Sequence, residues 1–219
     1  MSSEIINPNR REIYRYLGYK GELPDEATSA VIEKCIEDLM SACVPGFISR
    51  EFDIEIRDKR FITFEDVTVE SANLAKNLEG CQSMVVFVAT LGVGPDRLIA
   101  RASVGKPSEM VIYQAASAAM IEAYCNYHNR IIKEEKMTEG LHTRVRFSPG
   151  YGDFSIKHQR DIIRMLDASK KIGVTLTESL LMAPSKSVSA VIGLSRDEIE
   201  CELSGCELCQ KKDCNYKRN

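Results

Sequence analysis

A near-continuous run of apolar residues at positions 84–89 constrains the fold of this chain more than any other segment. Such a run is typical of a strand that is buried on both faces. The segments around it show helical and extended patterns in mixed order, without the strand–helix–strand rhythm of a parallel sheet. We therefore expect an α+β fold, a single domain in which a largely antiparallel sheet packs against helices.

Apolar spacing and capping residues predict the individual elements. Expected helices cover residues 10–17, 25–44, 71–80, 96–103, 108–135 and 156–171, and expected strands cover residues 47–56, 60–64, 66–69 and 187–194. Ser71, Ser108 and Ser155 are the expected N-caps of three of these helices. A turn containing Gly92 and Gly94 would suit a nucleotide-binding loop, but it lacks the third glycine and the later acidic residue of that motif. We interpret it as a packing turn.

Charge and hydropathy narrow the classes of partner. The 219 residues carry a net charge of -3, and no dense basic run precedes the last few residues, which argues against nucleic acid. No apolar stretch reaches about 18 residues, and the first residues lack the basic and apolar parts of a signal peptide. We expect a cytoplasmic protein that does not enter a membrane.

The eight cysteines fall into two groups. Cys35, Cys43, Cys81 and Cys125 lie singly in apolar segments, where a reduced and buried side chain is the simplest interpretation. The other four have the spacing C-x4-C-x2-C-x4-C, at Cys201, Cys206, Cys209 and Cys214. We therefore divide the chain into an α+β domain, residues 1–200, and a cysteine-rich tail, residues 201–219. The tail suits zinc or an iron–sulfur cluster; redox thiols and a flexible end are alternatives.

Residues 146–153, with the sequence Arg-Phe-Ser-Pro-Gly-Tyr-Gly-Asp, carry the clearest functional signal. Alternation predicts a strand on which Arg144, Arg146 and Ser148 share one face, while Val145 and Phe147 point to the other. A proline then ends the strand, and glycines at 150 and 152 flank Tyr151, so the main chain can approach a ligand closely. We expect this segment to hold a small, partly anionic molecule. We expect Asp153 to cap the helix that follows Ser155, and a contact with the ligand is the alternative.

Glu122 is the second candidate. It belongs to an apolar, small-residue stripe with 4-3-4-3 spacing on the longest expected helix, formed by Val111, Ala115, Ala118, Glu122 and Cys125. A carboxylate within such a stripe is unfavourable unless a cation from the protein or a ligand pairs with it. The alternative is a boundary glutamate that reaches solvent.

Three blocks of sequence together resemble the activation (reactivation) domain of cobalamin-dependent methionine synthase. They are the segment 146–153, the helix around residues 121–124 (Ile-Glu-Ala-Tyr), and the block with Glu178-Ser179, Met182, Pro184 and Ser187-Val188-Ser189. The resemblance covers residues 107–194, and the part from residue 13 onward is similar to free-standing versions of the domain. This chain departs from the fused domain at Gly152-Asp153-Phe154, at Ala183 in place of a tryptophan, and at Ile192 or Gly193 in place of a tyrosine. Lys186 and Ser187 are a polar pair in the last of these blocks that could reach the ligand or the partner.

The resemblance implies S-adenosylmethionine as ligand. Arg146 would bind its carboxylate and Glu122 its ammonium, with the backbone of Ser148, Pro149 and Gly150 lining the site. Tyr151 would face the corrin as the candidate catalytic residue.

The implied reaction is reductive methylation of cob(II)alamin to methylcobalamin. It would reactivate a methionine synthase that lacks its own activation domain, with the cobalamin carried by that partner and electrons supplied by flavodoxin or ferredoxin. The alternatives are another corrinoid protein as client, a non-catalytic S-adenosylmethionine-binding or docking module, or an electron-transfer protein that uses the cysteine tail.

Overall fold

The computed structural model describes residues 5–19 and 21–197. Its helices are α1 (Arg10–Tyr16), α2 (Glu26–Ala42), α3 (Ala72–Asn77), α4 (Gly94–Gly105), α5 (Pro107–Thr138), the 3-10 turn η1 (Ile156–His158), α6 (Gln159–Leu166) and α7 (Ala168–Ile172). Its strands are β1 (Gly46–Asp53), β2 (Glu55–Arg57), β3 (Phe61–Phe64), β4 (Val67–Glu70), β5 (Ser83–Thr90), β6 (His142–Thr143), β7 (Thr175–Leu176), β8 (Met182–Ala183) and β9 (Ser187–Ser195). Within these residues, no helix is long and apolar enough to span a membrane.

In the described part of the chain, a four-stranded sheet of order β1-β5-β9-β6 forms the centre of the fold. All of its neighbouring strands are antiparallel. Strand β5 is buried at every position, as its apolar run predicts, because it lies between β1 and β9 and is covered on both faces. The α+β prediction, with a largely antiparallel sheet under helices, is confirmed.

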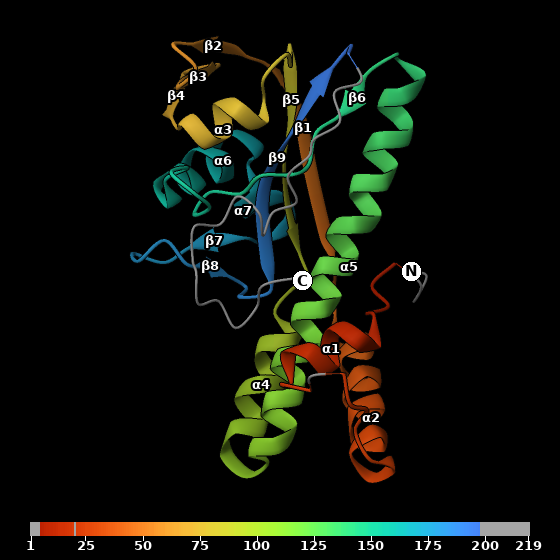
Figure 1. Cartoon of the computed structure of the whole chain (residues 1–219). Coiled ribbons are helices and arrows are strands. Elements are labelled where there is room, and N and C mark those ends of the chain that lie inside the picture. The colour runs from red at the N-terminus through yellow and green to blue at the C-terminus, as the bar shows by residue number, and fades with distance from the viewer. Residues whose placement is uncertain (1–4, 20, 198–219) are drawn as a thin grey trace.

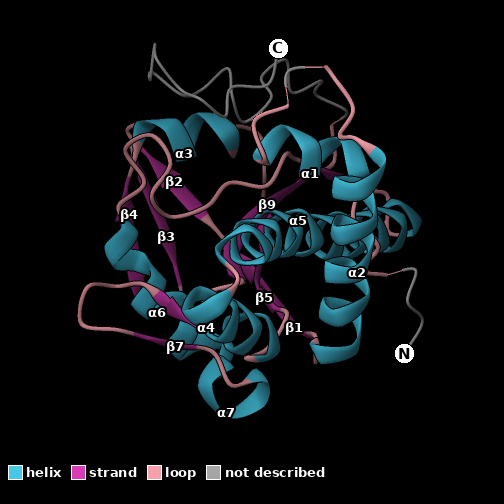
Figure 2. Cartoon of the chain, turned by 90° about the horizontal axis from the view of Figure 1, so that it is seen from below, coloured by secondary structure: helices cyan, strands magenta, loops and turns pink. Residues whose placement is uncertain are grey.

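Two hydrophobic cores lie on the two faces of this sheet. Val85, Phe87 and Ala89 of β5 belong to the core shared with α1, α2 and α5. Its alternate residues, from Met84 to Val88, belong to the core shared with α3, α6 and the β2-β3-β4 sheet. Figures 1 and 2 show α5 on one side of the central sheet and α3 and α6 on the other. Alternate residues of β5 enter different cores because successive side chains of a strand point to opposite faces of the sheet.

Two predicted helix boundaries are wrong. Helix α5 begins at Pro107, so Ser108 lies inside its first turn and does not cap it. The helix predicted over residues 156–171 is divided into η1, α6 and α7, because Asp167 adopts a left-handed conformation with φ 53°. Ser155 does cap this region, since its side chain accepts a hydrogen bond from the Lys157 N–H.

The turn with Gly92 and Gly94 packs against the end of α2. A Cβ atom added to Gly92 would lie 2.8 Å from the Val44 carbonyl oxygen, and one added to Gly94 would lie 2.0 Å from that of Ala42. The two glycines therefore allow a close approach between backbones, which supports the interpretation as a packing turn.

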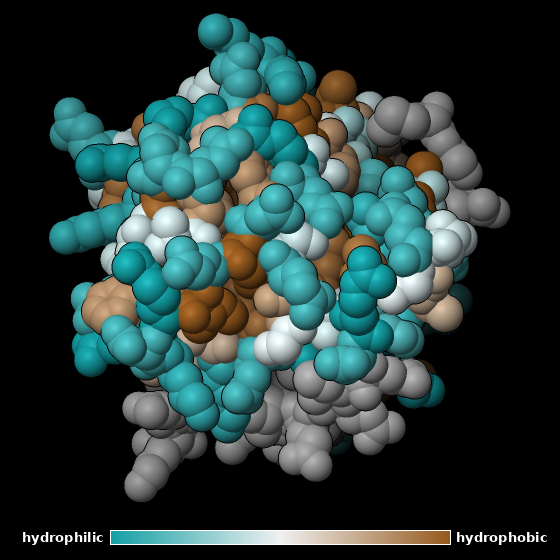
Figure 3. Space-filling model, turned by 90° about the horizontal axis from the view of Figure 1, so that it is seen from above, coloured by the Kyte–Doolittle hydropathy of each residue, from teal (hydrophilic) through white to brown (hydrophobic). Residues whose placement is uncertain are grey.

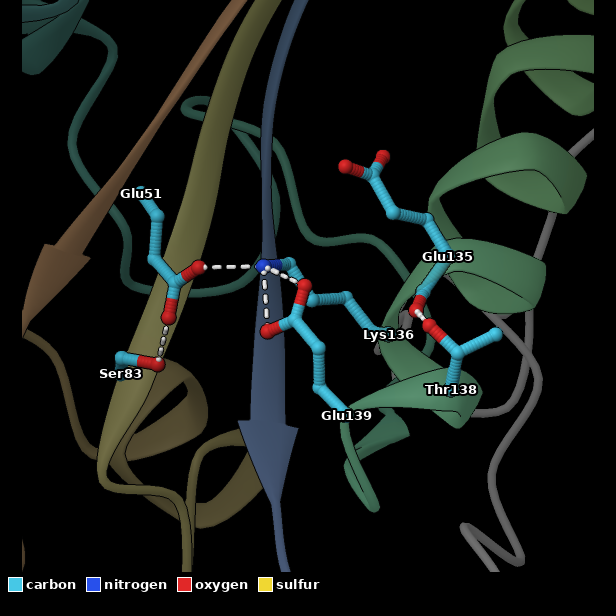
Figure 4. A network of polar contacts seen from close by, with 6 residues as sticks. All are labelled: Glu51, Ser83, Glu135, Lys136, Thr138 and Glu139. Carbon is cyan, nitrogen blue, oxygen red and sulfur yellow. Dashed lines mark hydrogen bonds and ion pairs between the residues drawn. The ribbon is translucent and has the colours of Figure 1, made fainter.

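A polar network ties the C-terminal end of α5 to the sheet. Lys136 Nζ lies 2.8 Å from Glu51 Oε2 on β1 and 2.9 Å from Glu139 Oε1, while the Ser83 hydroxyl donates to Glu51 at 2.6 Å (Figure 4). Burial alone raises the pKa of Glu51, but the hydrogen bonds from Lys136 and Ser83 and the Lys136 charge outweigh it and lower that pKa. Elsewhere on the upper face, hydrophilic side chains cover most of the surface, with small hydrophobic patches between them (Figure 3).

Candidate functional site

The segment 142–147 follows the edge of the sheet with one residue more than a regular strand would have. Thr143 pairs with Leu194, the Arg144 N–H donates to the Gly193 carbonyl, and Phe147 pairs with Val191. Three steps along this segment therefore match two steps along β9, which is the defining count of a β-bulge.

The bulge overturns the predicted alternation of side chains. Val145, expected to point inward, is 40% exposed, whereas Phe147 is buried as expected. Arg144 is buried beside Gly193 on the α3 side of the sheet, and its guanidinium donates to the Glu79 carbonyl at 2.7 Å. Arg146 points to α5 on the other side. The prediction that the two arginines share a face is wrong, since the extra residue re-aims the chain between them.

Arg146 contacts a row of polar side chains on α5, formed by Glu122, Asn126 and Asn129. Its Nη2 lies 2.5 Å from Glu122 Oε2, and its Nη1 donates to Asn126 Oδ1 at 2.9 Å. With the Asn129 amide oriented so that its nitrogen donates to the Cys125 carbonyl, its oxygen also accepts from Arg146 Nη1 at 3.1 Å. The side chains of Arg146 and Glu122 are 19% and 34% exposed. The structure thus brings the two predicted residues together.

This arrangement is complementary to a zwitterion. An α-amino acid carries a carboxylate that suits the planar guanidinium fork and an ammonium that suits a carboxylate. A ligand of this kind would exchange one ion pair, Arg146 with Glu122, for two, and both protein charges would stay paired. Because both side chains are partly exposed, solvent and ligand have access to them.

Several backbone groups of the loop after Arg146 form hydrogen bonds within the loop. The Gly150 N–H donates to the Phe154 carbonyl at 2.7 Å, and the Tyr151 N–H donates to the Ser148 carbonyl at 3.1 Å. Pro149 is buried, Gly150 has φ 95°, and the side chain of Tyr151 is 56% exposed. A ligand would therefore meet other backbone groups of this loop, with the Tyr151 ring open on its surface.

Asp153 caps a different helix from the one predicted. Its carboxylate accepts from the Ala72 N–H at 2.8 Å, from the Asn73 N–H at 3.1 Å and from the Ser71 hydroxyl, at the start of α3. A Cβ added to Gly152 would lie 2.8 Å from the Asn73 side-chain oxygen. The loop is thus fixed to α3, about 80 residues earlier in the sequence, which no local pattern could indicate.

Two more side chains meet this side of α5: Lys186, which the sequence offered as a residue that could reach the ligand or the partner, and Tyr16, which sequence reasoning missed. Tyr16 of α1 lies near Glu122, since its pKa is raised by burial and then by the Glu122 charge. Lys186, in the loop between β8 and β9, donates to Gln114 Oε1 of α5 at 2.9 Å. The polar pair at 186–187 gave the sequence signal for Lys186, and no pattern indicated Tyr16.

The cysteines of the described chain are not arranged as ligands. Cys35 and Cys125 are buried, and Cys43 and Cys81 are half-buried. Burial raises the pKa of Cys35 to about 11 and that of Cys125 to about 12, which keeps the thiols protonated. Among residues 5–19 and 21–197, no group of three or more His, Cys, Asp or Glu side chains could hold a metal ion. Cys201, Cys206, Cys209 and Cys214 lie outside the described residues, as does the predicted boundary at residue 200.

Comparison with known proteins places the fold and the family. The family described as "Vitamin B12 dependent methionine synthase, activation domain" matches residues 76–216. A crystal structure of the MetH reactivation domain bound to AdoHcy matches with a TM-score of 0.68 and 18% sequence identity, over 91% of this chain and 78% of that chain. At this identity the likeness shows the fold. No curated protein sequence matches the chain.

Proposed function

We propose, from the premise that this chain belongs to the family of the vitamin B12 dependent methionine synthase activation domain, that it binds S-adenosylmethionine and supports reductive methylation of cobalamin. The observation that carries the proposal is the half-buried pair of Arg146 and Glu122, which suits a zwitterionic amino acid. The MetH reactivation domain of similar fold was crystallised with AdoHcy, the product of such a methyl transfer.

The proposed reaction needs an electron and a methyl group. Cob(II)alamin takes one electron from a low-potential donor, and the sulfonium methyl then passes to cobalt as a methyl cation. The sulfur keeps its bonding electron pair, so the products are methylcobalamin and S-adenosylhomocysteine. Because methylation removes the reduced species, it draws an unfavourable reduction forward. In this scheme the protein positions the reactants and excludes water.

Each site residue has a role in this proposal. Arg146 binds the carboxylate of the ligand through its guanidinium fork, and Glu122 binds the ammonium. Ser148, Pro149 and Gly150 form the backbone beside the ligand. Tyr151, whose ring is exposed on the loop, faces the corrin and affects turnover more than binding.

The proposed client is a cobalamin-binding methionine synthase polypeptide without an activation domain of its own, and the proposed electron donor is a flavodoxin or a ferredoxin. Cys35, Cys43 and Cys125, which form no disulfide in the described chain, suit a cytoplasmic location, where thiols stay reduced. A different corrinoid protein is the alternative client, since the same ligand site would serve it equally well.

The test is anaerobic mixing of this protein with cob(II)alamin-loaded methionine synthase, S-adenosylmethionine and a low-potential reductant, followed by visible spectroscopy. We expect the spectrum of methylcobalamin to appear only when this chain is present. Arg146→Ala should abolish most of the conversion, whereas Arg160→Ala, an exposed arginine on α6, should not change it. Ligand binding without conversion would favour another corrinoid client or a non-catalytic binding module. If S-adenosylmethionine does not bind at all, the proposed function is wrong.

A further inference from the structure

The loop that carries Lys186 is fixed beside Gln114 of α5, at a distance from Arg146 along the helix. The Leu91 N–H donates to the Lys186 carbonyl at 2.9 Å, and the Ser187 hydroxyl donates to Thr90 Oγ1 at 2.8 Å. The neighbouring Ser185 donates its N–H to Asp96 Oδ2 at 2.8 Å and its hydroxyl to the same carboxylate. These contacts fix the loop and aim the Lys186 side chain at Gln114.

The charge of Lys186 is poorly compensated. Its Nζ donates to a neutral amide oxygen, and within the described chain it forms no ion pair with a carboxylate. The acid whose charge acts on it is Asp96, and this carboxylate is already bound by Ser185. Burial lowers the pKa of Lys186, and the Asp96 charge only partly opposes this effect. An ammonium has three donors, so donors remain for a ligand that can accept hydrogen bonds.

Two independent lengths place Lys186 at a fixed distance from Arg146. On α5, their partners Gln114 and Glu122 are eight residues apart, which corresponds to about 12 Å of helix rise. On β9, Ser187 adjoins Lys186, and Val191 pairs with Phe147 next to Arg146. The four steps from Ser187 to Val191 span about 13 Å of strand.

Between Gln114 and Glu122, this side of α5 carries the small side chain of Ala118. Gln114, Ala118 and Glu122 succeed one another at i, i+4 spacing on one side of α5, and Ala118 is half-buried. An extended molecule could therefore lie along this side of α5 over Ala118, with one end at Arg146 and the other at Lys186. Its first end must be zwitterionic and its second rich in hydrogen-bond acceptors.

We infer that Lys186 binds the adenosine end of the ligand whose amino-acid end is bound by Arg146 and Glu122. This inference rests on the proposed function and adds the residue that fixes the ligand's orientation. Adenine ring nitrogens and ribose oxygens are neutral acceptors, which suit an ammonium that has lost part of its hydration. The residues that align with the fused domain's tyrosine offer no polar side chain here, since Ile192 is buried in the core and Gly193 has no side chain.

The test separates the two ends of the ligand by calorimetry. S-adenosylhomocysteine has both ends, whereas methylthioadenosine keeps the adenosine and lacks the amino acid. We expect Lys186→Met to weaken the binding of both compounds by about tenfold or more, the range for a hydrogen bond to a charged donor. Arg146→Ala should weaken S-adenosylhomocysteine and leave methylthioadenosine nearly unchanged. Lys186→Arg should recover part of the affinity, and Lys133→Met, at an exposed lysine on α5, should have no effect.

The outcomes distinguish this inference from the proposed function. If Lys186→Met binds both compounds as the wild type does, while Arg146→Ala loses S-adenosylhomocysteine, the role of Lys186 is wrong and the proposed function stands. If Lys186→Met weakens only S-adenosylhomocysteine, Lys186 acts on the amino-acid end and the orientation is reversed. If the wild type binds neither compound, both proposals fail. Removal of a poorly compensated charge should leave the melting temperature unchanged or higher, so loss of folding would not explain weaker binding.

Discussion

The substitution Arg146→Ala tests the site most directly, because one side chain both ties the motif segment to α5 and is proposed to bind the ligand. It removes the ion pair with Glu122 and the hydrogen bond to Asn126. With side-chain exposures of 19% and 34%, the pair lies between an exposed ion pair, worth about 0.2–1 kcal/mol, and a buried one, where loss of one partner costs about 3–5 kcal/mol.

We therefore expect Arg146→Ala to lower the free energy of unfolding by about 1–2 kcal/mol, because Glu122 stays partly open to water. For a chain of this length, that corresponds to a decrease of about 2–8 °C in melting temperature. Loss of a hydrogen bond between charged groups costs about 1.5–3 kcal/mol, so the affinity for S-adenosylhomocysteine should fall by about 10- to 100-fold. The lower end applies if the wild-type ligand must first displace Glu122 from Arg146.

The two effects are measured separately, by urea unfolding and by calorimetric titration with S-adenosylhomocysteine, which cannot transfer a methyl group. Glu122→Gln should also weaken binding, while Glu135→Gln, on the exposed side of the same helix, should change neither quantity. A variant Arg146→Ala that is destabilised as expected yet binds within twofold of the wild type would refute the carboxylate role. Arg146 would then only anchor the segment to α5.

Three further predictions concern the frame and the tail. Lys136→Met should lower the free energy of unfolding by about 1 kcal/mol at pH 7. Because the pKa of Glu51 is lowered in the folded protein, the stabilisation from this ion pair is present above the ordinary Glu51 pKa of 4.5 and is lost as the pH falls. A difference from wild type that persists in urea unfolding at pH 3 would contradict this. Gly94→Ala should lower the free energy of unfolding by about 1–3 kcal/mol or more, because the added methyl group overpacks against the Ala42 carbonyl. The control Gly105→Ala, at a site with nothing within 4 Å, should have a free energy of unfolding within about 0.5 kcal/mol of wild type. Equal effects of the two variants in urea unfolding would contradict the packing role of the turn. Anaerobically purified protein should contain zinc, or iron with acid-labile sulfide, and lose it on replacement of Cys206 and Cys209 by serine; a metal-free and fully active wild type would refute a metal site in the tail.

The sequence predicts the sheet better than its edge. The apolar run of β5 is long enough to have one interpretation, and β9 beside it shows the same burial on both faces. At the edge, hydrophobicity alone is misleading: Val145 is apolar yet exposed, and Arg144 is charged yet buried, because its guanidinium donates to the Glu79 carbonyl. Likewise Asp153 is of a residue type that often caps the next helix, but it caps α3, far away in the sequence. These outcomes depend on tertiary contacts that no local period contains.

The β-bulge at this edge of the sheet also explains how the candidate site is built. In a strand without the extra residue, Arg144 and Arg146 would project to the same face, and both would meet either the α3 core or α5. The bulge separates them, so that Arg144 closes the gap beside Gly193 while Arg146 reaches Glu122. Bulges often re-aim a side chain next to a functional site, and here the re-aimed side chain contacts Glu122 and Asn126 on α5. The residue that breaks the sequence pattern is therefore the reason that a cation and a carboxylate from distant segments meet at the surface, where we propose that a zwitterion binds both.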